Sequence, residues 1–364
     1  MEINKLTLKN YRNYIYQEIE FCGGVNVFYG NNAQGKTNIL ESVFYCGFGR
    51  SHKNIKDRDI INFSADFSKI KLEYNGYNRE NTIKITLLKN ERKKIDINGL
   101  GTGSRARLLT AFTAILFCPE DLYLIKGGPG ERRKFLDGAI SQLKPKYYLT
   151  LCEYIKIINH KNKLLKMAAD DGSLNVWNEK LAEAGARIIL YRNLYIKRLQ
   201  GFIKSIHKEI APGEDIDIVY RPNIQTDRFD DEEYIKNLFV QKLFQCSEQE
   251  KNAKMSLFGI HKDDFEIFIN GENIKLFGSQ GQQRTAVLTL KMSQIELIKQ
   301  STGEYPVLLL DDILSELDKT RQEYLINKFD KYQVIITCTD IHSIKKESCR
   351  IFRVENGEVE CTCI

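Results

Sequence analysis

The hydrophobic pattern of this chain changes along its length, and the first part alternates. Apolar and polar side chains follow each other with period two over Lys69–Tyr74 and again over Ile83–Leu88. Such alternation is typical of strands with one buried face, and Asn75-Gly76 between the two runs is a turn signal. The segment from Ile3 to Ile19 has a looser pattern of the same kind. We therefore expect a small antiparallel sheet near the N-terminus.

The middle of the chain has a helical pattern instead. From Glu131 to about Ile210, apolar residues recur at spacings of three and four, which predicts amphipathic helices. Ala211-Pro212-Gly213 ends this stretch, because proline and glycine interrupt helices. Beyond it the pattern predicts three further elements: a strand over Ile216–Tyr220, a helix over about 232–247 and a hairpin strand over Phe265–Ile269.

The last third of the chain returns to short apolar runs. Val307–Leu310 and Val334–Thr337 are almost wholly apolar, and Val25–Tyr29 near the N-terminus also reads as a strand. Short runs that are apolar on both faces are typical of buried parallel strands. A hairpin over Ile351–Val359 is predicted to close the chain. The pattern predicts an α/β fold with a helix-rich part in the middle.

A complete phosphate-binding loop, G-x-x-x-x-G-K-[ST], follows directly after Val25–Tyr29. Its glycines let backbone N–H groups turn toward phosphate oxygens, and the helix predicted to start near Lys36 adds favourable charge at its N-terminus. We expect Lys36 to reach the β- and γ-phosphates of ATP and Thr37 to ligate Mg²⁺. The nucleotide-binding residues predicted from this loop are Gly30, Asn31, Asn32, Ala33, Gln34, Gly35, Lys36 and Thr37.

A second half of the site is predicted where the run Leu308–Leu310 ends in two carboxylates, Asp311 and Asp312. A buried strand that ends in this way is typical of the Walker B element, although a strand with an Asp-rich turn has the same composition. We expect Asp311 to hold Mg²⁺ through its waters. Asp312 is placed to orient or deprotonate the attacking water, so Asp312, Asp311 and Lys36 form the predicted catalytic set.

About three quarters of the chain separates these two motifs, and the end of that insertion contains a Ser-x-Gly-Gln turn before a helical run. The turn is similar to the ABC-type signature L-S-G-G-Q in a degenerate form, with Gly278 in place of leucine. Ser279, Gly281 and Gln282 would form a second anion site at a helix N-terminus. A second site makes sense if it caps the γ-phosphate held by another subunit. A simple Ser/Gly helix cap is the alternative.

The net charge of +6 is mildly basic, but its distribution is uneven. Residues 121–210 contain 17 Lys and Arg against 9 Asp and Glu. Such a surplus in one segment fits a surface that binds a polyanion, and a solvated helical face fits it equally well. The sequence has no run of 18 apolar residues, no signal-peptide core and no C-x-x-C pair. We therefore expect a cytosolic protein without a membrane partner.

Several further motifs make the chain resemble the RecF family of SMC/Rad50-like ABC ATPases over its whole length. The phosphate loop and the Walker B strand are common to many P-loop proteins, whereas the block from Pro119 to Asp137 and the Ser279–Arg284 form are more specific. The motifs that carry the resemblance are Leu6–Asn13, Gly30–Thr37, Gly47–His52, Phe117–Leu122, Gly127–Pro129, Arg132–Asp137, His261–Asp264, Ser279–Arg284 and Leu310–Asp318.

The resemblance implies an α/β fold with two lobes and no long coiled coil. Residues 1–125 and 290–364 would form an ABC-type ATPase lobe with a mixed sheet, and residues 126–289 a helical lobe that carries the signature. It also implies that two monomers close around two ATP molecules and clamp DNA at single-strand/duplex gaps. The family helps RecO and RecR proteins to load recombinase, with weak, DNA-stimulated ATP hydrolysis as a switch.

Some residue roles also follow from the resemblance alone. Arg50 would contact phosphate or the nucleotide base, or be a surface arginine. Glu120 lies where the Q-loop of the family should run and would sense Mg²⁺. The switch histidine of ABC ATPases would fall near Thr339 or Asp340, so the resemblance does not extend to that residue, and His342 is offset from the position.

Two other motifs of the family have no single role at this stage. Arg132 and Arg133 would grip DNA phosphate, serve a dimer interface or lie exposed on the surface. His261, Asp263 and Asp264 suggest a metal site, but a loop network is the preferred interpretation.

Two other classes of protein share the phosphate loop. A transporter's energising subunit carries a tight L-S-G-G-Q and a switch histidine, and this sequence has neither. A P-loop kinase for a small molecule would leave the Ser279 turn without a purpose. An arm of the Rad50 type is excluded because no long heptad run interrupts the chain.

Overall fold

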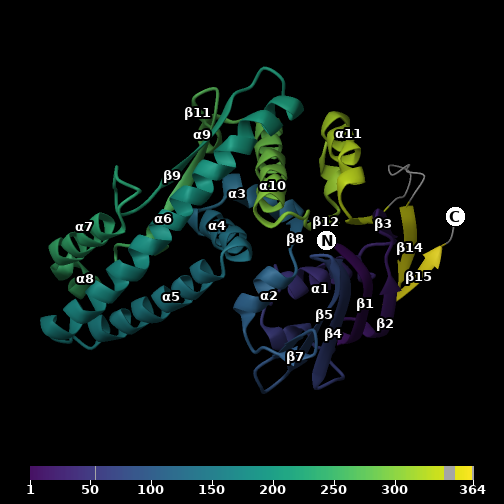
Figure 1. Cartoon of the computed structure of the whole chain (residues 1–364), viewed down its shortest axis with the longest axis horizontal. Coiled ribbons are helices and arrows are strands. Elements are labelled where there is room, and N and C mark those ends of the chain that lie inside the picture. The colour runs from purple at the N-terminus through teal and green to yellow at the C-terminus, as the bar shows by residue number, and fades with distance from the viewer. Residues whose placement is uncertain (54, 340–348, 363–364) are drawn as a thin grey trace. The chain divides into compact units, whose positions relative to one another are not determined.

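The computed structural model describes residues 1–53, 55–339 and 349–362. Thr339 lies within this range, whereas the predicted positions Asp340 and His342 lie outside the described residues. The chain divides into two compact units, residues 1–121 with 294–364, and residues 122–293. These breaks lie a few residues from the lobe boundaries expected from the sequence. Figure 1 shows the helices and strands of both units.

The first unit contains a six-stranded antiparallel sheet in the order β2-β1-β4-β5-β6-β7. Its central strands have the alternating burial that the sequence pattern predicts, with one face in the core. The antiparallel sheet expected near the N-terminus is therefore confirmed. The strands are β1 (Glu2–Tyr11), β2 (Tyr14–Glu20), β4 (Phe67–Gly76), β5 (Arg79–Leu88), β6 (Lys94–Ile97) and β7 (Leu100–Gly101).

A second six-stranded sheet of this unit is mixed, in the order β15-β14-β3-β13-β12-β8. All its neighbouring strands are parallel except the final hairpin of β14 and β15. The runs Val307–Leu310 and Val334–Thr337 lie in buried parallel strands, as predicted, and the predicted strand Val25–Tyr29 pairs with the second of them. The strands are β3 (Val25–Tyr29), β8 (Ala114–Phe117), β12 (Val307–Asp311), β13 (Val334–Cys338), β14 (Cys349–Glu355) and β15 (Glu358–Thr362).

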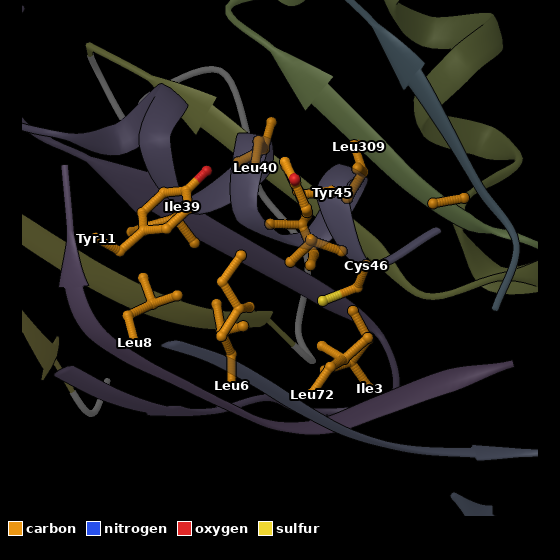
Figure 2. Packing of buried hydrophobic residues seen from close by; sticks show 14 of the residues in the cluster. Ile3, Leu6, Leu8, Tyr11, Ile39, Leu40, Tyr45, Cys46, Leu72 and Leu309 are labelled. Atoms are coloured by element: carbon orange, nitrogen blue, oxygen red, sulfur yellow. The ribbon is translucent and has the colours of Figure 1, made fainter. Parts of the chain in front are cut away.

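Helix α1 (Lys36–Phe48) packs against both sheets of this unit. Figure 2 shows two of its side chains, Ile39 and Cys46, on the side of the antiparallel sheet, where they lie near Tyr11, Leu8, Ile3 and Leu72. Burial of these side chains is the main favourable term that holds the helix in place. Because the helix begins at Lys36, this packing also fixes the position of the phosphate loop. The remaining helical elements among the described residues of this unit are η1 (Asp57–Ile60), α2 (Arg105–Ala111), η2 (Pro119–Leu122), η4 (Ile313–Glu316), α11 (Lys319–Asn327) and η5 (Phe329–Lys331).

The second unit is rich in helices, as predicted. The helical stretch after Glu131 is divided, since α4 ends before Pro145 and a turn over 167–170 separates α5 from α6. In Figure 1 the long helices α5 and α6 lie side by side. The elements are α3 (Tyr123–Lys126), α4 (Pro129–Leu143), α5 (Pro145–Lys166), α6 (Asp171–Ile210), β9 (Ile216–Arg221), α7 (Glu232–Gln245), α8 (Ser247–Ala253), η3 (Ile260–Lys262), β10 (Asp264–Ile269), β11 (Glu272–Asn273), α9 (Ile274–Phe277) and α10 (Gln280–Thr302), which continues into the first unit.

Arg192, 1% exposed, is the centre of a buried polar network in the second unit. Its guanidinium donates to Asp263 at 2.7 Å, to Asp137 at 2.8 Å and to the Tyr147 hydroxyl at 3.1 Å. Asp263 also accepts from the hydroxyl of Tyr220 at 2.5 Å. A buried charge is tolerated only when it is paired and hydrogen-bonded in this way. The loop network preferred for Asp263 is thus what the structure contains.

The neighbouring residues of the same motifs are also bound within the unit. Arg132 is buried and forms two hydrogen bonds to Asp264, at 2.6 and 2.8 Å. Arg133 donates to the backbone carbonyl of Asp263 at 2.7 Å. His261 Nδ1 lies 3.0 Å from the Tyr154 hydroxyl. Surface exposure of Arg132 is therefore excluded, and its charge is neutralised inside the unit.

None of the described helices contains a stretch that is both long and apolar enough to cross a membrane.

Candidate nucleotide site

The phosphate loop joins β3 to α1, so the strand, turn and helix predicted around it are confirmed. Two of its glycines have backbone angles that residues with a side chain rarely adopt, with φ of 152° at Gly30 and 117° at Gly35. A Cβ at Gly30 would lie 2.3 Å from the carbonyl oxygen of Val354, and one at Gly35 would lie 2.6 Å from Asn13 Nδ2. Both positions therefore require glycine, for backbone conformation and for space.

Lys36 begins α1 and is 7% exposed. Its ammonium donates to the carbonyl oxygens of Gly30 at 2.5 Å and Asn31 at 2.8 Å, so it lies across the loop. Burial lowers the pKa of Lys36, and the nearby carboxylates of Asp312 and Asp311 oppose that shift. The cation is thus held where phosphate oxygens would enter the loop.

Asp311 ends β12 and is 7% exposed. One of its carboxylate oxygens accepts from the hydroxyl of Thr37 at 2.9 Å and from the hydroxyl of Thr337 at 2.8 Å. Two of the three residues predicted for Mg²⁺, Thr37 and Asp311, are therefore in direct contact although they are far apart in the sequence. The contact arises because β3, β13 and β12 are parallel neighbours that end at one edge of the sheet.

Asp312 follows at the end of the same strand, with a left-handed backbone at φ 51°. Its N–H donates to the Thr337 hydroxyl at 3.0 Å. Burial and the adjacent Asp311 carboxylate raise its pKa, while Lys36 lowers it. A carboxylate with a raised pKa is a better proton acceptor than an ordinary aspartate, which suits the predicted role toward water.

The turn between β1 and β2 forms hydrogen bonds with the phosphate loop. Asn13 donates to the Gln34 carbonyl oxygen at 2.9 Å, and the Tyr14 hydroxyl donates to the Gly35 carbonyl oxygen at 3.1 Å. On the other side, the Gln34 side chain accepts from the N–H of Asn356 at 2.6 Å. The sequence motif at Asn13 carried the resemblance, but its contact with the loop could not be derived from any local pattern.

A buried ion pair ties the same turn to α1. Arg12 donates to both carboxylate oxygens of Glu41, at 2.8 and 2.9 Å, and Ser51 donates to one of them. Burial raises the pKa of Glu41, but the hydrogen bonds from Arg12 and Ser51 outweigh it, and the pKa is lowered overall. A carboxylate within the apolar run of a helix is the signal that points to such a partner.

Glu120 and Arg50 are both exposed. Glu120 lies in η2 after β8, which is parallel to β12, and so at the same edge of the sheet as Asp311. Both carboxylates act on the pKa of His52, which burial lowers. Arg50 follows the C-cap of α1 at Gly49. The metal role of Glu120 and the nucleotide role of Arg50 remain predictions.

The signature turn begins α10, and the part of it predicted to bind anions lies in the second unit. Gln282 N–H donates to the Ser279 hydroxyl at 3.2 Å, and Ser279 N–H donates to the Gln282 side chain at 3.0 Å. This reciprocal pair is a capping box, readable from the spacing Ser-x-x-Gln. Gln282 also donates to Glu214 at 2.9 Å. The helix-cap alternative is therefore present in the structure, and Ser279 stays exposed at a helix N-terminus.

The residues of this site fit ATP and Mg²⁺ by their chemistry. Mg²⁺ prefers oxygen ligands and takes few of them from the protein when phosphates supply the rest. Within the part of the chain that the structure describes, no group of three His, Cys, Asp or Glu gathers as a closed metal cage would. One carboxylate beside one hydroxyl at a phosphate loop is the donor set that a nucleotide-bound magnesium needs.

Comparison with known proteins finds similarity to the RecF family over almost the whole chain. Residues 2–360 match the family model of the RecF/RecN/SMC N terminal domain. The DNA replication and repair protein RecF of Clostridium perfringens (strain SM101 / Type A) is 40% identical, over 99% of this chain and 100% of that protein. The protein of the same name from Clostridium tetani (strain Massachusetts / E88) is 42% identical, over 98% of this chain and 99% of that protein.

Solved structures are similar over the same extent. The recombination mediator protein RecF in complex with ATP has a TM-score of 0.94 and 34% identity, over 100% of this chain and 98% of that one. An Smc head domain from Pyrococcus furiosus has a TM-score of 0.57 and 16% identity, over 99% and 96%, so that likeness concerns the fold alone. The predicted fold, a P-loop ATPase part with a mixed sheet plus a helix-rich part, is confirmed.

Proposed function

The chain belongs to the RecF family of SMC-like ABC ATPases, and on this premise we propose that it is an ATP-switched, DNA-binding protein of recombinational repair. Its relatives are named DNA replication and repair proteins, and the similar RecF structures are described as a recombination mediator with ATP or ATPrS in the RecFOR pathway. In this proposal ATP binding selects one conformation, and weak, DNA-stimulated hydrolysis releases it.

The contact between Thr37 and Asp311 is the observation that carries the ATPase part of the proposal. Lys36 exchanges its loop carbonyls for phosphate oxygens, and the Thr37 hydroxyl oxygen turns toward the metal position beside Asp311. Bound Mg²⁺ would neutralise charge on the β- and γ-phosphates. Asp312 orients the water at the end of the strand and accepts its proton.

The dimer in this proposal is inferred from the signature turn. Ser279, Gly281 and Gln282 lie at the start of α10, a long helix whose N-terminus attracts anions. We assign this turn to the γ-phosphate of an ATP molecule held by the phosphate loop of a second copy. Two such contacts would close a homodimer only when ATP is bound, which makes dimerisation the switch.

DNA is the polyanion that the proposal places in the closed dimer. Exposed lysines of the second unit supply a basic surface, and the preferred site would be a gap where single-stranded DNA meets duplex. Proteins of the RecO and RecR type are the proposed partners for loading recombinase. The basic surplus supports DNA binding, whereas the gap preference and the partners rest on family membership.

Binding to gapped DNA by fluorescence anisotropy tests the proposal, with ATP, with ADP and without nucleotide. Affinity should rise only with ATP and fall steeply with salt, because phosphate contacts release counterions. Lys36→Met should abolish ATP binding and the ATP-dependent gain, while the exposed Lys9→Met should change neither. If ATP binds but DNA does not under any nucleotide, the DNA part of the proposal is wrong.

The dimer is tested separately by light scattering with ATP. Ser279→Arg should leave ATP binding by the monomer intact and prevent ATP-dependent dimerisation, because the larger cation blocks the signature turn. Ser205→Arg, at an exposed position of α6, is the matched control and should dimerise normally. ATP-dependent dimers that survive Ser279→Arg would contradict the sandwich arrangement.

A further inference from the structure

A hollow of about 450 Å³ lies on the first unit, among residues that neither the nucleotide loop nor the Walker B strand contains. It is formed by the β4–β5 turn, the β6–β7 hairpin and the end of α2. We name it the arginine hollow, after the six lining residues that define it: Tyr74, Arg79, Asn81, Ile97, Leu100 and Arg107. Its volume suits one large side chain and its flanking backbone.

The buried polar side chains at the floor of the arginine hollow form hydrogen bonds within the unit. Tyr74 is 2% exposed, and its hydroxyl donates to the Ala111 carbonyl oxygen at 2.7 Å. Asn81 is 5% exposed, donates to the Gly76 carbonyl oxygen at 2.9 Å and accepts from Asn98 at 3.0 Å. A floor whose polar atoms are already paired keeps its shape and presents mainly apolar surface to a ligand.

The rim of the arginine hollow combines exposed apolar groups with positive charge. Leu100 is 68% exposed and Tyr77 is 41% exposed, although both carry large apolar side chains. Arg79 and Arg107 line the same hollow, and no Asp or Glu among the described residues lines it. Within the described residues, neither arginine forms an ion pair. The rim therefore offers ten N–H donors in two planar forks, which match carboxylates well.

The surroundings confine a negative ligand to this hollow. A second hollow of about 540 Å³ shares Arg79 but is lined by Glu2, Glu80 and Glu304. Those carboxylates would repel an anion on that side, so the favourable position lies between Arg79 and Arg107. They would equally repel a long phosphate backbone, which disfavours a nucleic acid that passes across both hollows.

We propose that the arginine hollow docks an acidic peptide segment of a partner protein, with one aromatic or large aliphatic side chain inserted against Leu100 and Ile97. Carboxylates of the segment pair with Arg79 and Arg107, and the inserted side chain covers the exposed apolar rim. Neither contact uses ATP, because no residue of the phosphate loop lines the hollow. The site is an anchor for a partner protein that acts beside the ATP switch.

The test uses the full chain and a fluorescein-labelled peptide, Asp-Glu-Asp-Gly-Leu-Phe, in fluorescence anisotropy. Two control peptides separate the contributions: Asn-Gln-Asn-Gly-Leu-Phe lacks the charge and Asp-Glu-Asp-Gly-Ser-Ser lacks the apolar group. The parent peptide should bind, both controls should bind at least about tenfold more weakly, and salt should weaken the parent peptide. A fluorescein-labelled oligothymidine of similar length tests nucleic acid; if it depends on the same arginines and binds more tightly, the peptide assignment is overturned.

Variants then place the binding at this hollow. Arg79→Glu with Arg107→Glu should weaken the peptide by at least about tenfold, since attraction becomes repulsion. Lys84→Glu with Lys94→Glu changes the net charge equally on the same sheet, outside the hollow, and should bind the peptide normally. Peptide binding that is undetectable, or equally weakened by both pairs, overturns the proposal. Lys36→Met should keep peptide binding, which separates this inference from the ATP-dependent function.

Discussion

At the scale of single residues, Thr337 has the most informative position. It is the second-last residue of β13, the strand that runs between the phosphate-loop strand and the Walker B strand. Its hydroxyl bridges Asp311 and the N–H of Asp312. Nothing in the apolar run Val334–Thr337 distinguishes this hydroxyl from any other strand threonine. Its role depends on the ends of three strands that are distant in sequence and neighbours in the sheet.

Thr337→Val should damage the site while it preserves the shape of the side chain. The substitution leaves Asp312 N–H without its partner, at a cost of about 1–3 kcal/mol in the free energy of unfolding. Displacement of Asp311 should lower Mg²⁺-dependent ATP hydrolysis by roughly ten- to hundredfold. Urea unfolding and a phosphate-release assay measure the two effects. Thr86→Val, on a half-buried strand position of the other sheet, is the control, and an equal loss of hydrolysis there would refute the bridging role.

His261 gives a prediction about pH. Burial lowers its pKa from 6.5 to about 4, and Lys262 and Arg133 act in the same direction. Between these two values the unfolded chain binds a proton that the folded chain does not, so stability is present above pH 6.5 and is lost as the pH falls toward 4. This residue alone should lower the free energy of unfolding by about 2 kcal/mol between pH 7 and pH 5.

The measurement is the urea midpoint at both pH values for the wild type and for His261→Gln, which keeps a hydrogen-bonding group beside Tyr154. The variant should lose that part of the pH dependence. His160→Gln, at an exposed position of α5, should keep it. If the wild type and His261→Gln lose the same stability on acidification, the buried histidine is not the source.

At the scale of elements, helix α6 contains two glycines with opposite surroundings. A Cβ at Gly185 would lie 2.4 Å from the ring of Phe239 in α7, whereas a Cβ at Gly201 would meet nothing within 4 Å. Gly185 therefore lets two helices approach closely, and Gly201 only adds flexibility to the unfolded chain. Gly185→Ala should destabilise the protein by about 1–3 kcal/mol, and Gly201→Ala should stabilise it by about 0.5–1 kcal/mol. Urea unfolding of both variants checks this. Stabilisation by Gly185→Ala would show that the ring of Phe239 moves aside without cost, and would contradict the prediction.

Elements were predicted well where the signal is local, and badly where it depends on a distant partner. The phosphate loop, the apolar strands and the alternating sheet each follow from a short pattern of residues. The buried position of Arg132 depends on Asp264, and the loop support by Asn13 depends on Gln34, so neither has a local signal. The capping box of Ser279 and Gln282 did have one, in the Ser-x-x-Gln spacing. For these residues the sequence favoured a signature and gave a helix cap as the alternative.

At the scale of the whole molecule, the structure changes what the basic surplus of residues 121–210 means. Arg132, Lys161 and Arg192 are buried in ion pairs with Asp264, Glu250 and Asp263, so they contribute little field outside the protein. The surplus that reaches solvent comes mainly from lysines on the exposed faces of helices such as α6. Only these exposed lysine ammonium groups can contact a phosphate backbone.

Three exposed lysines of the C-terminal half of α6, Lys197, Lys204 and Lys208, form one basic stripe. Their spacings of seven and four place them on one side of the helix. Substitution of all three by glutamine should lower the slope of log K against log salt for DNA binding by roughly 0.9 for each lost phosphate contact. Loss of affinity should be similar for DNA of different sequences, because phosphate contacts carry no sequence information.

The matched control replaces three exposed lysines of the first unit, Lys9, Lys84 and Lys94, by glutamine. It removes the same net charge, so a general electrostatic effect would change both variants equally. If only the α6 variant loses slope, the DNA path follows that helix. If the α6 variant loses no more slope than the control, these three lysines make no specific phosphate contacts and belong to a solvated helical face.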